Sequence, residues 1–175
     1  MATASSPPVL PSQSEQRIHA TCVALGNKGV LLRGKSGSGK SDLALRLISQ
    51  PLIWLKDSVG PTVPPSTDPC LGQLVGDDQI IVWKHTSRLM ARPDPRLAGK
   101  LEVRGLGIVT VPFVSQISVA LVVDLVSRNS VPRMPEAEQC CEINGVRLPL
   151  LVLSPFEASA VAKLSLAARQ MPTNF

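Results

Sequence analysis

The sequence of 175 residues predicts one domain of the α/β class, because its length fits a single domain and strand-like and helix-like segments follow one another along it. Three observations support this prediction. A glycine-rich octapeptide, Gly34–Ser41, stands between an apolar strand-like segment and a segment with helical spacing. Two apolar runs rich in β-branched residues follow, at 108–114 and 118–126. The last segment, from Pro155 onward, has the pattern of a helix start.

The composition is that of a folded chain with an aliphatic core. Apolar residues make up 44% of the chain and charged residues 18%, which excludes a chain that is disordered throughout. There are no tyrosines, three phenylalanines and two tryptophans, which argues against modules that stack nucleobases on aromatic rings. The net charge of +5 is spread along the chain. Its densest part, 84–104, is interpreted as a solvated surface, and a site for phosphate or an acidic partner is the alternative. We therefore expect no nucleic-acid partner.

The sequence shows no sign of a membrane or secretory context. No run of about 18 apolar residues is present, and the N-terminus lacks a basic segment followed by an apolar one. The four cysteines have no zinc-binding spacing, so reduced thiols are the simplest interpretation. We expect a cytoplasmic protein that does not contact a membrane.

The N-terminal part predicts a β-hairpin after a disordered lead-in. Residues 1–16 are small, polar and proline-containing, so the folded domain is expected to span 17–175. Apolar residues predict strands at 18–25 and 30–33, and the Gly-Asn-Lys-Gly turn between them favours a hairpin.

The middle of the chain combines a helix, a loop and several strands. Leucines with helical spacing predict a helix that starts at Asp42 and is limited by Pro51. The proline-rich stretch 58–72 is interpreted as a long surface loop inserted into the domain. Beyond it, 74–83 predicts a strand interrupted by two acids, 86–100 is mixed, and 102–107 predicts a tight loop shaped by glycine. The runs 108–114 and 118–126 predict buried strands.

The C-terminal part contains two strong local signals. Asn144-Gly145 lies between two strand-like segments and predicts a type I′ hairpin. Ser154, Pro155 and Glu157 have the spacing of an N-cap, a first helical residue and a capping-box acid. They predict a helix from Pro155 to about Gln170.

The octapeptide matches the pattern G-x-x-x-x-G-K-[ST] of a phosphate-binding P-loop. Its glycines allow backbone N–H groups to point inward around an anion, and the following helix adds the partial positive charge of its N-terminus. Lys40 can reach the β- and γ-phosphates and the Ser41 hydroxyl can bind Mg²⁺. The predicted nucleotide-binding residues are Gly34, Lys35, Ser36, Gly37, Ser38, Gly39, Lys40 and Ser41.

A P-loop does not by itself define the reaction, because an acid must also hold Mg²⁺ or activate the attacking group. Asp124 ends an apolar run of the kind that often carries such an acid. Asp77 and Asp78 follow Leu74-Val75-Gly76, closer in sequence to the P-loop helix. The alternatives without a catalytic role are a solvated strand end for Asp124 and a turn for Asp77-Asp78. We favour Asp77-Asp78 over Asp124 as the functional acids.

Four elements occur in an order that resembles a known family. They are Ile18-His19, the P-loop, Leu74-Val75-x-Asp77-Asp78 and Glu102-Val103-Arg104-Gly105-Leu106-Gly107-Ile108. Together they resemble the catalytic domain of bacterial HPr kinase/phosphorylase, in the short form that lacks a separate N-terminal domain. The resemblance implies a P-loop-containing mixed β-sheet with flanking helices, as in HPr kinases and phosphoenolpyruvate carboxykinases. It also implies ATP and Mg²⁺ as cofactors and HPr as the protein substrate. Inorganic phosphate or pyrophosphate as a partner and a hexameric assembly are further implications.

The resemblance also implies roles for the matching residues. Asp78 would accept the proton of the substrate serine and return it in the reverse reaction. Lys40 would stabilise the transferring phosphoryl group, while Ser41, Glu102 and Asp77 would hold Mg²⁺. His19 would lie near the phosphates and Arg104 would support the Glu102 loop. From the residues alone, His19 could instead be a structural histidine in a strand, and Arg104 could instead form a surface salt bridge.

One departure from the family keeps other functions open. Long members carry a late Gly-Arg-Asn element, whereas the corresponding region here reads Ser154-Pro155-Phe156-Glu157-Ala158-Ser159-Ala160; Lys163 and Arg133 are candidates to replace its arginine. The first alternative function is a small-metabolite kinase, with Arg88, Arg92 and Arg96 as an arginine lid. The second is an ATP-binding regulatory module without phosphotransfer. A GTPase is least favoured, since no N-K-x-D motif occurs.

Overall fold

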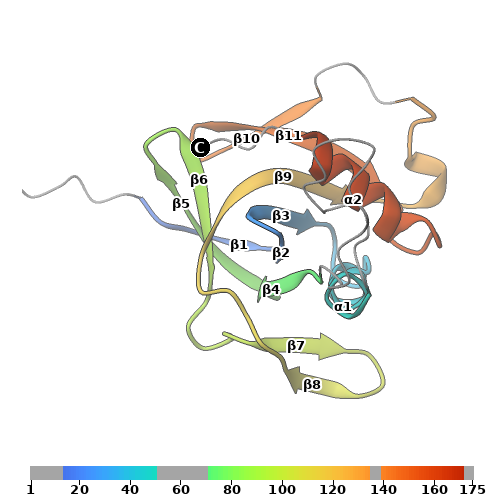
Figure 1. The fold of residues 1–175 in the computed structure, drawn as a ribbon, viewed down its shortest axis with the longest axis horizontal. Helices are drawn as coiled ribbons and strands as arrows, with labels where there is room; N and C mark the ends of the chain where they lie inside the picture. Colours follow the sequence, from blue (N-terminus) through green and yellow to red (C-terminus); the bar gives the residue numbers. More distant parts are fainter. Residues whose placement is uncertain (1–13, 51–70, 135–138, 172–175) are drawn as a thin grey trace, which may run out of the picture.

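The computed structural model describes residues 14–50, 71–134 and 139–171 (Figure 1). Within these ranges the chain forms the strands β1 (Gln16–His19), β2 (Thr21–Leu25), β3 (Lys28–Arg33), β4 (Gln73–Gly76), β5 (Gln79–His85), β6 (Arg88–Pro93), β7 (Lys100–Val103), β8 (Gly107–Thr110), β9 (Ile117–Leu125), β10 (Cys140–Ile143) and β11 (Val146–Leu153). The helices are α1 (Lys40–Ser49), α2 (Ala160–Gln170) and the 3-10 turn η2 (Arg128–Ser130). The predicted lead-in up to residue 13 and most of the predicted loop 58–72 lie outside the described residues. No described helix has both the length and the apolar character needed to cross a membrane.

The strands form a mixed sheet, which confirms the predicted fold class. The strand order is β1-β5-β6-β9-β3-β2-β4, and β11 also pairs with β9 and carries β10 at its outer side. The pairs β3/β9 and β9/β11 are parallel, while the others in this sheet are antiparallel. The hairpin β7–β8 forms a separate two-stranded sheet below the main one in Figure 1.

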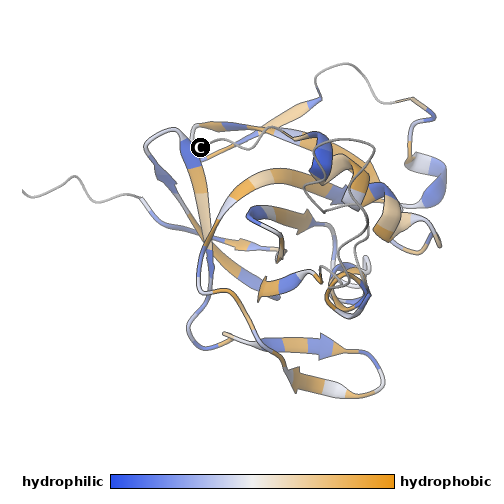
Figure 2. Ribbon diagram, viewed as in Figure 1, coloured by the Kyte–Doolittle hydropathy of each residue, from blue (hydrophilic) through white to orange (hydrophobic). Residues whose placement is uncertain are grey.

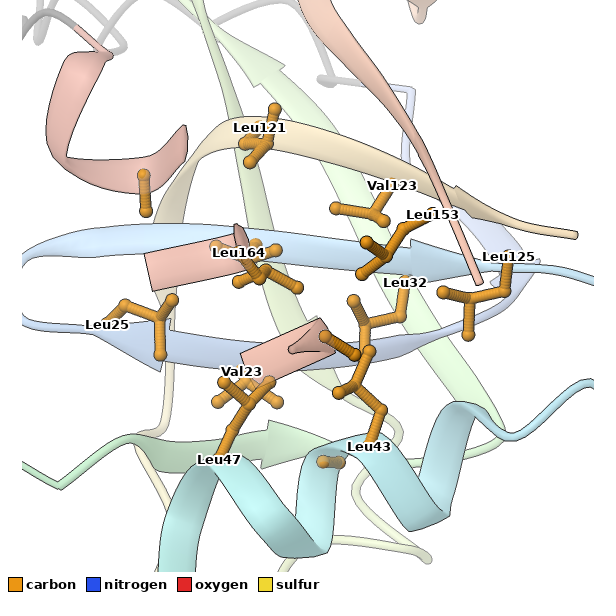
Figure 3. Packing of buried hydrophobic residues seen from close by; sticks show 14 of the residues in the cluster. Val23, Leu25, Leu32, Leu43, Leu47, Leu121, Val123, Leu125, Leu153 and Leu164 are labelled. Carbon is orange, nitrogen blue, oxygen red and sulfur yellow. The ribbon is translucent and has the colours of Figure 1, made fainter. Parts of the chain in front are cut away.

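The core consists of two aliphatic clusters on the two faces of the sheet. The first contains Leu43 and Leu47 of α1 and Leu164 of α2, which pack against β2, β3 and β9 (Figure 3). Successive residues of β3 alternate between the clusters: Leu32 belongs to the first and Leu31 to the second. Among the residues that the structure describes, none of those buried in either cluster is aromatic, as the composition predicted.

Two predicted strands are each divided into two, and their breaks lie side by side. The segment 18–25 breaks at Ala20 into β1 and β2, and 74–83 breaks at Asp77-Asp78 into β4 and β5. The Ala20 N–H donates to the Asp78 carbonyl at 3.2 Å. β1 and β5 lie at one end of the sheet order and β2 and β4 at the other, so both chain segments must turn here. Asp78 takes a positive φ of 66° in this turn.

The segment 86–110 differs most from the sequence-based expectations. The mixed part contains a regular strand, β6, which pairs with β5 across the turn at Thr86-Ser87. The expected loop at 102–107 is a hairpin, with Glu102 inside β7. The prediction of a buried strand from Ile108 onward is wrong, because β8 lies at the surface and Ile108 is 71% exposed. β8 is largely hydrophobic despite this exposure (Figure 2).

The C-terminal helix starts later than predicted. The type I′ hairpin is confirmed by the positive φ angles of Asn144 (50°) and Gly145 (69°). The prediction of Ser154 as N-cap is wrong: α2 begins at Ala160 after Ser159. Residues 154–159 instead form a turn, in which the Pro155 carbonyl accepts a hydrogen bond from Arg46 of α1. This bond holds the turn against the P-loop helix.

Candidate active site

The P-loop joins β3 to α1, and its glycines adopt the left-handed conformations that the tight turn requires. The φ angles of Gly37 and Gly39 are 75° and 89°, and Lys40 is the first residue of α1. A Cβ atom on Gly39 would lie 2.9 Å from Phe156 Cζ, so a side chain here would be both strained and obstructed. The structure therefore has the backbone geometry of an anion-binding loop at a helix N-terminus.

The Lys40 ammonium is buried in the centre of the site, with only 7% of the residue exposed. It donates to the carbonyl oxygens of Gly34 (3.0 Å) and Lys35 (3.1 Å), and its third neighbour is His19 Nε2 at 3.1 Å. Burial lowers the pKa of Lys40, and the negative charges of Asp77 and Asp78 oppose this shift. An anion beside this ammonium would replace solvation that the lysine has lost.

The Asp77 carboxylate is 5% exposed and satisfied by three elements of the fold. Its Oδ1 accepts from Thr21 Oγ1 on β2 (2.6 Å) and from Ser41 Oγ on α1 (3.1 Å). Its Oδ2 accepts from the Glu102 backbone N–H on β7 (3.2 Å). Asp77 therefore fixes the Ser41 hydroxyl and the start of the β7–β8 hairpin relative to each other.

Asp78 points the other way, toward solvent and His19. Its side chain is 60% exposed, and its Oδ1 lies 3.0 Å from His19 Nδ1. Since an ammonium can only donate, His19 Nε2 accepts from Lys40 and leaves Nδ1–H to donate to Asp78. A chain of polar contacts thus runs from Lys40 through His19 to Asp78.

One cavity of about 460 Å³ brings these groups together. Glu102 of β7 and Arg104 of the turn that follows it also line this cavity. Of the predicted site residues, the structure places His19, Ser36, Gly37, Gly39, Lys40, Ser41, Asp77, Asp78, Glu102 and Arg104 along its wall.

The other candidates lie elsewhere. Asp124 forms a bidentate ion pair with Arg33 (2.7 and 2.8 Å) and lines neither this cavity nor the larger one beside the P-loop. Lys163 is bound to Glu157, and Arg133 is exposed; neither lines these cavities. The plain alternative of a surface salt bridge for Arg104 finds no support in the described residues, where it has no ion-pair partner.

Two residues of the site were not anticipated. Thr21 binds Asp77, and its only sequence signal is a hydroxyl within an apolar strand. Phe156 lines the site although it lies 117 positions beyond Gly39, the residue it packs against. No local pattern could have indicated that contact.

The oxygen ligands of the cavity fit Mg²⁺ when nucleotide phosphates complete its coordination. Among the described residues, no three His, Cys, Asp or Glu side chains gather closely enough to hold a metal ion alone. Ser41 Oγ and the Glu102 carboxylate line the cavity from two sides, whereas both Asp77 oxygens already accept hydrogen bonds. Mg²⁺ commonly binds through one or two protein groups, phosphate oxygens and water, which suits this arrangement.

Comparisons with known proteins agree with the motifs. The chain is 32% identical to an HPr kinase/phosphorylase of Mycoplasma genitalium over 96 residues, which are 55% of this chain and 24% of that protein. It is 33% identical to the enzyme of the same name from Clostridium acetobutylicum over 107 residues, 61% of this chain and 29% of the relative. The match to the HPr kinase/phosphorylase of Malacoplasma penetrans is 27% identical and covers 79% of this chain and 43% of that protein. The chain thus matches less than half the length of these curated relatives. No family model matches.

The fold has a counterpart among solved structures. The structure of the Hpr(Ser) kinase/phosphatase from Coxiella burnetii aligns with a TM-score of 0.67 at 24% identity, covering 88% of this chain and 94% of that one. A match of this identity establishes the fold. The resemblance to HPr kinase/phosphorylases that the motifs indicated is therefore confirmed, by the sequences of the relatives and by the fold of the solved structure.

Proposed function

We propose that this chain is a phosphotransferase that moves the γ-phosphoryl group of ATP to a serine hydroxyl of an HPr-type carrier protein. The observation that carries the proposal is the Lys40–His19–Asp78 contact chain, which places an exposed carboxylate beside the P-loop lysine. The sequence similarity to HPr kinase/phosphorylases supports the choice of reaction and substrate.

In the forward reaction the Asp78 carboxylate accepts the proton of the serine hydroxyl. The serine oxygen forms a bond to the γ-phosphorus while the bond between that phosphorus and the β,γ-bridging oxygen breaks, so ADP leaves. Lys40 and the P-loop N–H groups neutralise the negative charge on the transferring group. Mg²⁺, when bound through Ser41 and Glu102, neutralises further phosphate charge.

The position of Asp78 suits a large acceptor. Its exposed side chain faces a cavity that the β7–β8 hairpin borders, so a serine on a protein surface can reach it. His19 Nδ1–H donates to Asp78 Oδ1 and holds the carboxylate in place. In the reverse direction, which we propose with inorganic phosphate as acceptor, protonated Asp78 returns its proton to the departing serine oxygen.

Three further features belong to the proposal through the family resemblance. They are release of pyrophosphate in the reverse reaction, assembly into a homo-oligomer of hexamer type, and a location in the cytoplasm. The unpaired thiols of Cys22, Cys140 and Cys141 fit a reducing compartment.

Replacing the proposed base tests the reaction. Asp78→Asn removes the proton acceptor but keeps the size of the side chain, so transfer to HPr should fall by about 100-fold to 10,000-fold. Binding of ATP should change less than about threefold, because the P-loop and Lys40 are intact. The measurements are transfer of label from γ-labelled ATP to HPr and binding of a fluorescent ATP analogue.

Glu142→Gln is the matched control, because Glu142 is an exposed acid on β10 that does not line the cavity. Transfer retained in Asp78→Asn would show that another group accepts the proton. Wild-type protein that binds ATP without labelling HPr would favour a regulatory ATP-binding module. ATP consumed without label on HPr would favour a small-metabolite kinase.

A further inference from the structure

Thr21, the first residue of β2, is completely buried beside the Asp77 carboxylate. Its Oγ1 donates to Asp77 Oδ1 at 2.6 Å, although the two residues lie 56 positions apart in the sequence. A hydroxyl that donates to a carboxylate at this distance forms a charge-assisted hydrogen bond, which is about twice as strong as a bond between neutral groups. The other residues of β2 are apolar, so valine, which has nearly the same shape, would serve the packing of this strand equally well. The hydroxyl therefore needs a reason beyond packing.

Thr21 belongs to a contact between the β1–β2 junction and the break that separates β4 from β5. His19 Nδ1 lies 3.0 Å from Asp78 Oδ1, and the Ala20 N–H donates to the Asp78 carbonyl at 3.2 Å. The Thr21 hydroxyl donates to the preceding acid, Asp77. Three consecutive residues of one segment thus hold both acids of the other, and Thr21 holds the buried one.

The remaining partners of Asp77 lie on elements outside the main sheet. Ser41 belongs to α1, which packs on the sheet, and the Glu102 N–H belongs to β7, which is part of the separate two-stranded sheet. Thr21 lies within the main sheet, where it is paired with Leu32 of β3. Without the Thr21 hydroxyl, the carboxylate would be held only by the two groups whose positions it determines.

We infer that Thr21 is a positioning residue of the site, whose hydroxyl fixes the Asp77 carboxylate and thereby the Ser41 hydroxyl and the Glu102 backbone. Because the Ser41 O–H donates to Asp77, the lone pairs of its oxygen stay available for a metal ion in the cavity. The bond from the Glu102 N–H likewise determines where β7 presents the Glu102 carboxylate. Thr21 does not line the cavity, so it acts only through Asp77. The inference rests on the proposed function only where Ser41 and Glu102 meet Mg²⁺.

Thr21→Val removes the hydroxyl and nearly keeps the shape of the side chain. In the nucleotide-free protein, the Glu102 amide hydrogen should then exchange with solvent roughly 3-fold to 10-fold faster, because its acceptor is less firmly held. NMR-detected hydrogen exchange measures this rate. Half-saturation of a fluorescent ATP analogue should need about 10-fold to 100-fold more Mg²⁺, and kcat for HPr phosphorylation should fall by a similar factor. The KM for HPr should stay within about twofold, since the acceptor does not touch Thr21.

Thr21→Ser keeps the hydroxyl and should stay within about threefold of the wild type in amide exchange, Mg²⁺ dependence and kcat. Ser165→Ala is the matched control and should change none of the three. It removes another buried hydroxyl, whose bond to the Val161 carbonyl on α2 lies outside the cavity wall. In the background of Asp77→Asn, Thr21→Val should lower kcat no further, because a residue that acts through Asp77 has no additional effect once that carboxylate is gone. If Thr21→Val does not fold, Thr21→Ala takes its place in each measurement.

Wild-type amide exchange and Mg²⁺ dependence in Thr21→Val would overturn the inference. Equal losses in Thr21→Ser would also overturn it, since the methyl group and not the hydroxyl would then matter. A further loss of kcat in the Asp77→Asn background would show that Thr21 acts by packing alone. If the wild type did not label HPr, the proposed function would fail, whereas amide exchange in the nucleotide-free protein would still decide the role of Thr21.

Discussion

At the scale of single residues, Asp77 and Asp78 show how two adjacent acids acquire different roles. Asp77 is buried and accepts hydrogen bonds from Thr21, Ser41 and the Glu102 backbone, as a buried carboxylate requires. Asp78 is exposed and has His19 as its partner. The positive φ of Asp78 turns the chain so that its neighbour faces inward while it faces the cavity. The first acid therefore organises the site, and the second is available for chemistry.

Asp124 gives a prediction that separates the two candidate acids of the sequence. Its carboxylate is occupied by Arg33, and about one third of each side chain is exposed. Asp124→Asn should lower the free energy of unfolding by up to about 1 kcal/mol, because a partly exposed ion pair contributes little. HPr phosphorylation should stay within about threefold of the wild type. Urea unfolding and the labelling assay measure both effects; a loss of transfer above 100-fold would make Asp124 the functional acid.

At the scale of elements, local signals predicted what local physics determines. Asn144-Gly145 specifies its hairpin because both residues tolerate positive φ, and the P-loop specifies a strand before it and a helix after it. The exposed hairpin β7–β8 was missed because its apolar residues have the pattern of a buried strand. The start of α2 was misplaced because Ser154 is buried and Arg46 holds Pro155 in a turn, which are contacts between distant segments.

Asp94, the residue after β6, joins β1 to the following turn and makes stability depend on pH. It is 1% exposed and accepts from the Arg96 backbone and guanidinium (3.0–3.1 Å), with Arg17 of β1 at 3.1 Å. Hydrogen bonds from Arg96 hold the pKa of Asp94 well below its usual range. Because the folded-state pKa is depressed, the carboxylate stabilises the fold above the ordinary aspartate pKa of about 3.9, and this contribution is lost as the pH falls below that value.

Asp94→Asn should therefore lower the urea midpoint by the same amount at every pH between roughly 5 and 8, because the wild-type carboxylate is ionised throughout this range in both the folded and the unfolded state. The difference from the wild type should shrink as the pH falls from about 4 toward 2. Glu142→Gln, at an exposed acid, should show no such convergence. A difference that stayed constant down to pH 2 would show that the ionised carboxylate is not the source of the stability.

At the scale of the whole molecule, the candidate site depends on segments that the chain brings together from its entire length. The acids and the P-loop could be predicted because each lies in a short recognisable motif. The larger cavity could not, since Arg128 and Phe156 join the P-loop only through the parallel pairing of β3, β9 and β11. That pairing places the chain after β9 and after β11 at the end of β3 where the P-loop begins (Figure 1).

Lys28 joins the start of β3 to the end of α2, and its replacement tests how much this contact stabilises the fold. At the start of β3, its ammonium donates to the carbonyl oxygens of Ala168 (3.0 Å) and Met171 (2.6 Å) at the end of α2. These carbonyls lack helical partners, and a cation also interacts favourably with the helix C-terminus.

Lys28→Met keeps the aliphatic stem and removes the donor, so it should cost about 1–2 kcal/mol of unfolding free energy. Thermal and urea unfolding should show this loss, while HPr phosphorylation at low temperature stays near the wild-type rate. Lys84→Met, which removes a single exposed bond to the Gly145 carbonyl, is the control and should cost less than about 0.5 kcal/mol. Equal losses in the two variants would show that α2 is held to β3 by its apolar face alone.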